Sequence, residues 1–192
     1  MTGFQFLLAL FGILVVFALL ALWVRRMIGQ ITANWAPNTQ FVNGTFSRFR
    51  TRLNGTYQER PILTYLGNEG GGEFGPTTFC YTLRMTVPPG FENWSMVCAV
   101  PRKGEPPEWT LKAKPGPADR LKAEGLLTAV EDAAKFWRLR YRAGSGRLEL
   151  SIAGVGMYFC PDVVMFQRQL DLLSRLASIT QAASVSSLHH AA

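Results

Sequence analysis

The first segment of the chain is an uninterrupted apolar run, and it constrains the molecule more than any other feature. From Phe4 to Val24 every residue is apolar, Gly or Ala except Gln5. A helix of these 21 residues would be about 31 Å long, which matches the hydrocarbon thickness of a bilayer. Trp23 stands near the end of the run, where an aromatic ring favours the membrane interface. The run therefore predicts a transmembrane anchor over residues 1–26.

The charges beside the run separate an anchor from a cleaved signal peptide and predict its orientation. A signal peptide carries positive charge before a shorter apolar stretch and small residues after it. In this chain the only charge before Phe4 is the amino terminus, whereas Arg25 and Arg26 follow the run directly. Because positive flanks stay on the cytoplasmic side, we expect a single pass through an inner, cytoplasmic-type membrane, with the N-terminus outside and the domain in the cytoplasm.

The rest of the chain divides into a connector, one domain and a tail. Residues 27–45 are interpreted as a connector, because the sequence Ala36-Pro37-Asn38-Thr39 should break an extension of the membrane helix. Residues 46–181 are enough for one domain with its own core and too few for two. Residues 182–192 are small and polar, which is typical of a flexible tail.

Alternation of apolar and polar residues predicts strands in the domain. Thr77 to Val87 alternates most clearly, with its apolar side chains on one face. Residues 55–66 predict a hairpin that turns near Gln58-Glu59-Arg60. Two shorter strands are expected at residues 95–100 and 109–113.

A second hairpin is predicted over residues 137–152. When the chain is folded about the Gly-Ser turn in its middle, Leu139 faces Leu150 on the apolar side. The same register places Arg140 opposite Glu149 on the other side. One alignment therefore satisfies the apolar residues and an ion pair together.

Three helices complete the predicted fold. Residues 117–124 form a short helix with proline in its first turn. The capping box Thr128-Ala-Val-Glu131 opens a second helix, which continues to about Phe136. A longer helix begins after Pro161-Asp162, where apolar residues recur at helical spacing. The fold class is α+β: one N-terminal transmembrane helix, then a small, mostly antiparallel β-sheet domain with two short helices and a C-terminal helix.

The sequence contains no recognisable catalytic, cofactor-binding or metal-binding site, and we expect a protein that is not an enzyme. The only histidines are His189 and His190, in the expected tail, which disfavours acid–base chemistry or a metal site based on histidine. Gly144-Ser145-Gly146 lies in the hairpin turn and lacks the spacing of a nucleophile elbow. The three cysteines form no Cys-x-x-Cys pair and are typical of buried thiols in a reducing compartment. They are Cys80, Cys98 and Cys160.

Basic residues are the candidate contacts for a partner. The chain has 20 Lys and Arg against 13 Asp and Glu, a net charge of +7, which favours anionic partners. The two clusters are Arg48, Arg50 and Arg52, and Arg138, Arg140 and Arg142. The first is either the solvated face of a first strand or a segment that rests on anionic lipid headgroups.

The second cluster lies on the predicted hairpin face opposite the aromatic residues. Because the rings then belong to the core, no base-stacking platform results, and nucleic acid is not an expected partner. An acidic protein face or an anionic lipid surface fits these arginines better. A simply solvated face is an equally good account.

The order of elements and several short motifs resemble an uncharacterised group of bacterial membrane-associated proteins. That group has a Gly-Thr-Tyr-x-Gly-Arg-x-Val hairpin, further strands, short helices, a second hairpin and a terminal helix. The similarity covers residues 53–180, and Glu59 stands where the group has glycine. The matching residues are Gly55-Thr56-Tyr57, Arg60-Pro61-Ile62, Trp109-Thr110-Leu111-Lys112, Leu126-Leu127-Thr128, Arg147-Leu148-Glu149-Leu150 and Leu170-Asp171-Leu172-Leu173. The group has no established activity, so the resemblance implies a fold and leaves function open.

These observations favour a non-catalytic, single-pass accessory or scaffolding subunit of a larger membrane complex, with other integral membrane subunits as its partners. Energy-transducing assemblies often contain one-helix subunits, and by analogy a photosynthetic reaction-centre or antenna complex is the most specific expectation. The alternative is a membrane-anchored module that binds anionic lipid or a small ligand. An enzyme acting at the membrane is the least favoured class.

Overall fold

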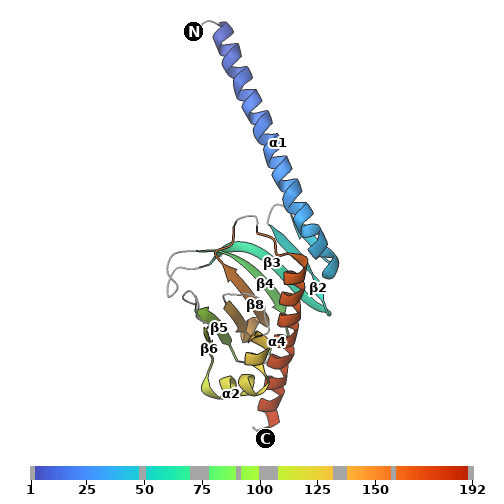
Figure 1. Cartoon of the computed structure of the whole chain (residues 1–192), viewed down its shortest axis with the longest axis vertical. Helices are drawn as coiled ribbons and strands as arrows, with labels where there is room; N and C mark the ends of the chain where they lie inside the picture. The colour runs from blue at the N-terminus through green and yellow to red at the C-terminus, as the bar shows by residue number, and fades with distance from the viewer. Residues whose placement is uncertain are drawn as a thin grey trace.

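The computed structural model consists of one long helix that projects from a domain built on a β-sheet (Figure 1). Helix α4 lies along one side of the sheet, and the free ends of α1 and α4 lie at opposite ends of the molecule (Figure 1). The structure describes residues 3–47, 51–69, 78–89, 92–99, 108–131, 138–156 and 159–189.

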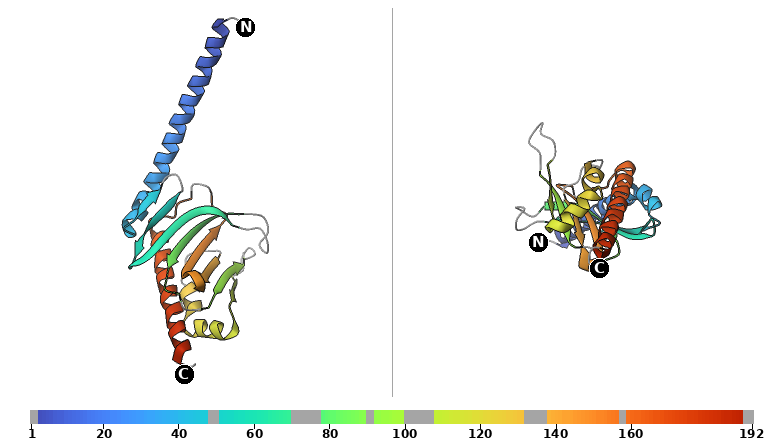
Figure 2. Two further views of the ribbon diagram at one scale, coloured as in Figure 1. Left: turned by 180° about the vertical axis from the view of Figure 1, so that it is seen from behind. Right: turned by 90° about the horizontal axis from the view of Figure 1, so that it is seen from below.

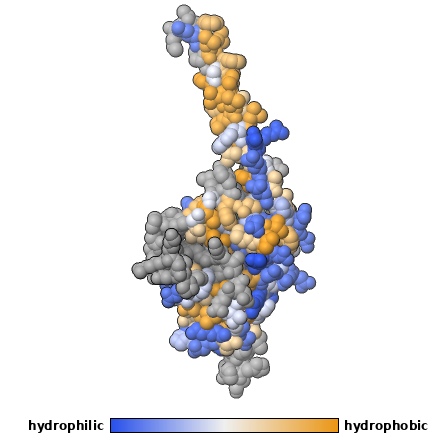
Figure 3. All heavy atoms as spheres, viewed as in Figure 1, coloured by the Kyte–Doolittle hydropathy of each residue, from blue (hydrophilic) through white to orange (hydrophobic). Residues whose placement is uncertain are grey.

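Helix α1 spans Gly3–Phe41 without a break. Among the described residues it is the one helix that is long and apolar enough to cross a membrane. Apolar side chains cover its projecting part (Figure 3). At about 1.5 Å per residue its 39 residues extend about 58 Å, nearly twice the hydrocarbon thickness of a bilayer. A large part of α1 therefore lies outside any bilayer that it spans.

The helix break expected at residues 36–39 is wrong, because α1 continues through Pro37 to Phe41. Most of the expected connector is therefore helix. A proline in a helix interior removes one backbone hydrogen bond and costs about 3 kcal/mol. Pro37 lies close to the end of the helix, where few helical bonds follow it. Its neighbours in the same turns also make tertiary contacts that outweigh the cost.

Two buried side chains, Trp35 and Asn38, fix the end of α1 in the domain. Trp35 is 1% exposed; its ring stacks on Phe46 at 5.3 Å between centroids and meets the edge of Phe166 at 6.4 Å. Asn38 donates from Nδ2 to the carbonyl oxygen of Pro161 at 2.9 Å. The helix thus enters the core of the domain instead of ending above it.

The domain is built on one antiparallel sheet of eight strands among the described residues. In their order across the sheet the strands are β1 (Thr45–Ser47), β2 (Arg52–Tyr57), β3 (Arg60–Glu69), β4 (Thr78–Thr86), β8 (Arg147–Ala153), β7 (Arg138–Arg142), β5 (Trp94–Ala99) and β6 (Glu108–Lys112). The predicted strand and both predicted hairpins are confirmed, as β4, β2–β3 and β7–β8.

The domain helices are α2 (Pro115–Ala123), α3 (Leu126–Glu131) and α4 (Val163–His189), and a 3-10 turn, η1 (Ala143–Ser145), joins β7 to β8. Together with α1 and the sheet they confirm the predicted α+β architecture.

The register of the β7–β8 hairpin is the predicted one. Leu139 pairs with Leu150, and both side chains are fully buried. Arg140 pairs with Glu149 on the opposite face. Trp137, which begins the predicted hairpin, lies outside the described residues.

The core lies between one face of the sheet and helix α4. A row of paired residues crosses six strands on this face, and every side chain in the row is 0% exposed. The row is Leu53, Thr64, Leu83, Leu150, Leu139 and Met96. Helix α4 contributes the stripe that its helical spacing predicts: Phe166, Leu170, Leu173, Leu176, Ala177 and Thr180, all buried.

All three domain helices have boundaries that differ from the sequence-based ones. Helix α2 begins at Pro115, two residues before the predicted start, and ends at Ala123. Thr128 lies inside α3, which begins at Leu126, so it is no N-cap. Gly125 fills the turn between the helices with a φ of 85°, and its carbonyl oxygen accepts the first helical hydrogen bond, from Ala129 N. Helix α4 continues to the end of the described residues, and Ala183 is fully buried, so the start of the expected tail is helical.

Candidate binding surface on the outer face of the sheet

The helices of the domain lie on one side of the sheet, and the other side presents the alternate residues of each strand (Figure 2). We call this side the outer face. Its described basic residues are Arg52, Arg84, Lys112, Arg138, Arg140, Arg142 and Arg147. Its described acidic residues, placed by register, are Glu69, Glu108 and Glu149. The outer face therefore carries an excess of positive charge.

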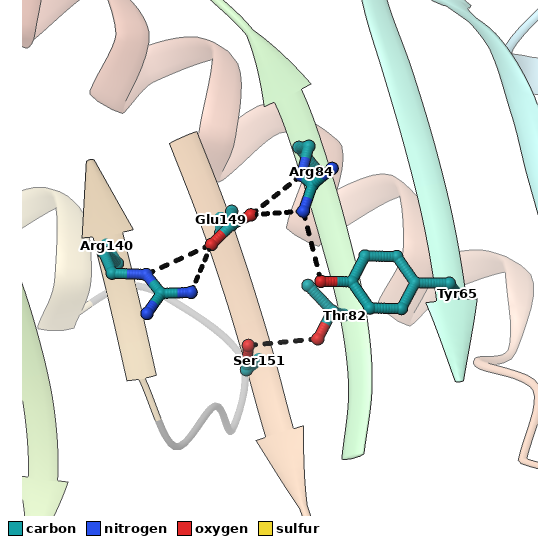
Figure 4. Close-up of polar contacts among 6 residues, drawn as sticks. All are labelled: Tyr65, Thr82, Arg84, Arg140, Glu149 and Ser151. Atoms are coloured by element: carbon teal, nitrogen blue, oxygen red, sulfur yellow. Dashed lines mark hydrogen bonds and ion pairs between the residues drawn. The ribbon is translucent and has the colours of Figure 1, made fainter. Parts of the chain in front are cut away.

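Glu149 is the centre of an ion-pair cluster on the outer face (Figure 4). Its side chain is 3% exposed and lies between two arginines from neighbouring strands. Arg84 donates from Nε to Oε1 at 2.8 Å, and its Nη2 lies 2.7 Å from the same oxygen. Arg140 donates from Nε and Nη2 to Oε2 at 3.1 and 2.6 Å. Both carboxylate oxygens are thus occupied, and two nitrogens of each guanidinium are held.

The cluster keeps Glu149 charged and fixes the direction of both arginines. Burial by itself would raise the pKa of Glu149, but the hydrogen bonds and charges of Arg140 and Arg84 outweigh it, so the pKa lies below its ordinary value. Arg84 also donates from Nη2 to the Tyr65 hydroxyl at 3.3 Å, and its guanidinium lies 5.3 Å from the centre of that ring. Because one carboxylate meets two guanidinium groups, the cluster retains a net positive charge.

Strand register brings the three residues of the cluster together. Arg84 of β4 pairs with Glu149 of β8, which pairs with Arg140 of β7. The Arg140–Glu149 ion pair is predictable from the hairpin, and the structure confirms it. Sequence reasoning missed Arg84 as a partner, because β4 and β8 are distant in the chain. The only signal was its place on the polar face of an alternating strand.

A pocket of about 520 Å³ opens beside this cluster. It lies between β5, the end of β6 and the β7–β8 turn. Its lining residues are Asn93, Trp94, Ser95, Lys112, Arg140, Tyr141, Arg142, Gly144 and Ser145. None of these described lining residues is acidic. Asn93 ties the turn to the start of β5, since its Oδ1 accepts a hydrogen bond from Ala143 N at 2.8 Å.

The structure brings together only some of the predicted contact residues. Arg138, Arg140 and Arg142 lie side by side on β7, and all three belong to the outer face. Arg52 is exposed on the same face but lies on β2, towards the other edge of the sheet. Arg48 and Arg50 lie outside the described residues, so their strand or membrane role stays a prediction.

The predicted anchor residues all lie on the projecting part of α1. Phe4, Trp23 and Val24 are exposed apolar side chains, with 71%, 58% and 41% of their surface accessible. Arg25 and Arg26 follow them and are also exposed. This is the arrangement expected of a membrane segment with a basic flank.

The described residues include no group of three His, Cys, Asp or Glu placed to hold a metal ion. All three cysteines are free thiols; Cys80 is buried, whereas Cys98 and Cys160 are half-buried, which differs from the expectation that all three are buried. Burial raises the pKa of Cys160 to about 11 and also raises the pKa of Cys98. Both groups are therefore protonated near neutral pH and are poor nucleophiles.

Comparison of the chain with protein-family models, with curated proteins and with solved structures finds no match. The resemblance to the uncharacterised bacterial group therefore stays a prediction. One conformational detail bears on it. Glu59, where that group has glycine, has a φ of 65°, a left-handed conformation that glycine adopts without steric cost.

Proposed function

We propose that this protein is a non-catalytic, single-pass accessory subunit of a larger membrane complex. In this proposal α1 crosses the bilayer beside other integral subunits, and the outer face of the sheet docks on an acidic surface of the same complex. The observation that carries the proposal is the basic outer face, which none of the described helices covers. Among its described residues, seven basic ones against three acidic ones complement an acidic protein surface.

The rigid junction with α1 supports the same function. The helix runs without a break from the apolar segment to Trp35, which is buried in the domain. Trp35 follows Arg25 by ten helical steps, about 15 Å along the helix, so the domain is held close to the membrane surface. The domain therefore has a fixed height above the membrane and a fixed rotation about the helix axis. Such a domain suits a docking subunit, because it loses little conformational freedom when it binds its partner.

The cytoplasmic orientation is part of the proposal, and it rests on Arg25 and Arg26. Protease added to right-side-out vesicles is expected to leave the domain intact, whereas protease added to inverted vesicles is expected to degrade it. Digestion from the outside would overturn the orientation, and with it a cytoplasmic partner surface.

The docking surface is tested by purification from the native membrane in a mild detergent. The full-length protein is expected to co-purify with a stoichiometric set of integral membrane subunits. The double variant Arg52→Glu with Arg147→Glu reverses two exposed charges of the outer face, and the co-purifying subunits should dissociate from it as salt rises. The matched control, Lys122→Glu with Arg168→Glu, reverses two exposed charges on helices and should retain the subunits. A full-length protein that purifies alone would contradict the proposal.

A further inference from the structure

We propose that the pocket beside Arg140 is a binding site for a phosphate-bearing ligand, with Arg140, Arg142 and Lys112 as the residues that contact the phosphate oxygens. This site goes beyond the docking function and does not depend on it. The inference rests on charge, on the geometry of Arg140 and on the size of the pocket.

The charge around the pocket favours a multiply charged anion. Lys112, Arg140 and Arg142 line it, and Arg84 on β4 shares the Glu149 carboxylate with Arg140. The three arginines alone, against this one carboxylate, leave an excess of two positive charges. A monocarboxylate would neutralise one of them, whereas a phosphate monoester neutralises both. Arginine also matches phosphate oxygens through its planar set of donors.

Arg140 is held ready for such a ligand before the ligand arrives. Its Nε and Nη2 are bonded to Glu149, whereas its Nη1 makes no hydrogen bond to any described residue. Glu149 is itself held from the other side by Arg84. A guanidinium already fixed in one rotamer loses little conformational entropy when it binds an anion. Arg140 therefore acts as a preorganised donor, and Glu149 as the residue that positions it.

The size and the other lining groups fit a phosphate attached to an organic body. The volume of about 520 Å³ lies within the usual range of small-molecule pockets, which is about 300–1,000 Å³. Asn93 uses its oxygen to hold Ala143, so its amide nitrogen is left to donate.

The first measurement is calorimetric titration of the full-length protein in detergent with inorganic pyrophosphate, at about 0.15 M salt to suppress non-specific attraction. A parallel titration uses nanodiscs that contain phosphatidic acid, whose headgroup is a phosphate monoester. Saturable binding of pyrophosphate assigns the site to a soluble ligand. Saturable binding of the nanodiscs alone assigns it to a lipid headgroup. Both results require the variants below to weaken the binding.

The pocket variants are Arg142→Gln and Lys112→Gln, both exposed and therefore harmless to the core. Each removes one charge-assisted hydrogen bond to the phosphate and should raise the dissociation constant about tenfold. Arg140→Gln should raise the dissociation constant at least as much, and the fold of this variant is checked by circular dichroism. The controls Lys122→Gln and Arg168→Gln remove exposed charges outside the pocket and should change the affinity less than about twofold. Absence of saturable binding to either probe, or equal effects of controls and pocket variants, would overturn the site.

Discussion

The β2–β3 turn shows what a single residue contributes to this fold. Gln58 and Glu59 both have positive φ, at 47° and 65°, so the two-residue turn has the backbone of a type I′ hairpin, in which Asn-Gly is favoured. Gln58 is held by its side chain, whose oxygen accepts a hydrogen bond from the hydroxyl of Ser174 in α4. Glu59 is exposed and has no hydrogen bond or ion pair with any described residue. The left-handed conformation of Glu59 is therefore uncompensated.

Replacement of this residue by glycine should stabilise the protein. The left-handed conformation costs an L-residue about 1–2 kcal/mol, and glycine removes this cost. Part of the gain is lost, because glycine has greater conformational freedom in the unfolded chain. Glu59→Gly should therefore raise the free energy of unfolding by about 0.5–1 kcal/mol. The control is Glu124→Gly, at an exposed position with a φ of −76°, which should be neutral or destabilising. A lower melting temperature for Glu59→Gly would show that the turn does not have this geometry.

The ion-pair cluster makes a residue-scale prediction about pH. Because the folded-state pKa of Glu149 is lowered from 4.5, its contribution to stability is fully present above about pH 4.5 and is lost as the pH falls through the folded-state pKa. At pH 7, Glu149→Gln should cost about 2 kcal/mol, since it leaves two quarter-exposed arginines without their anion. The difference in melting temperature between wild type and variant should therefore shrink on acidification to about pH 3.

A matched variant separates this cluster from acid denaturation in general. Glu108→Gln also removes a carboxylate from the outer face, but Glu108 is exposed. Its effect should be small at every pH. If the difference in melting temperature between wild type and Glu149→Gln stays constant between neutral pH and about pH 3, the assigned ion pairs are wrong.

At the scale of elements, the β7–β8 hairpin can be tested by two substitutions only three residues apart. Leu139 is 0% exposed in the core, whereas Arg142 is exposed on the outer face. Leu139→Asp places an unpaired charge in the core and should cost several kcal/mol, enough to unfold the domain. Arg142→Asp should leave the melting temperature nearly unchanged. Equal tolerance of the two variants in circular dichroism melts would show that the register is wrong.

The elements that could be predicted from the sequence are those whose information is local. The β7–β8 register follows from residues within one hairpin, and the α4 stripe follows from spacing within one helix. The pairing of β4 with β8 could not be predicted, because no local pattern selects one partner among several alternating strands. This is why the Arg140–Glu149 pair was foreseen and Arg84 was not. For the same reason the pocket, whose walls come from β5, β6 and β7, has no signature in any one segment.

Tertiary contacts also overrode local signals in the helices. The proline-containing sequence at residues 36–39 favours a break, but burial of Trp35 and the hydrogen bond from Asn38 keep the chain helical. The small, polar residues after Ala182 suggest a tail, but Ala183 continues the apolar spacing of α4 one turn after Ile179 and is buried. In both cases the deciding partner is distant in the sequence.

For the whole molecule, the unbroken α1 has a mechanical consequence. The apolar segment and the sheet domain belong to one stiff element, so the rotation of the helix in the bilayer sets the direction of the outer face. A flexible connector would let the domain find its partner from any direction. A continuous helix requires that the membrane contacts of α1 and the docking contacts of the outer face be in phase. We thus expect docking of the outer face to depend on the rotation of the domain about the axis of α1.

Insertions into α1 test this dependence directly. Alanines inserted between Arg26 and Met27, after the basic flank of the apolar segment and before Trp35, rotate the domain by about 100° per residue and raise it by about 1.5 Å per residue. Two alanines turn the outer face by about 200° and lift the domain by about 3 Å, whereas four turn it by about 400°, a net 40°, and lift it by about 6 Å. If phase governs docking, the four-residue insertion should retain the co-purifying subunits better than the two-residue insertion, although it displaces the domain further. Both variants should fold with wild-type circular dichroism spectra, since the inserted residues lie outside the core. Equal retention by the two variants would indicate a flexible joint, and a steady loss with insertion length would indicate that distance from the membrane, and not rotation, governs the contact.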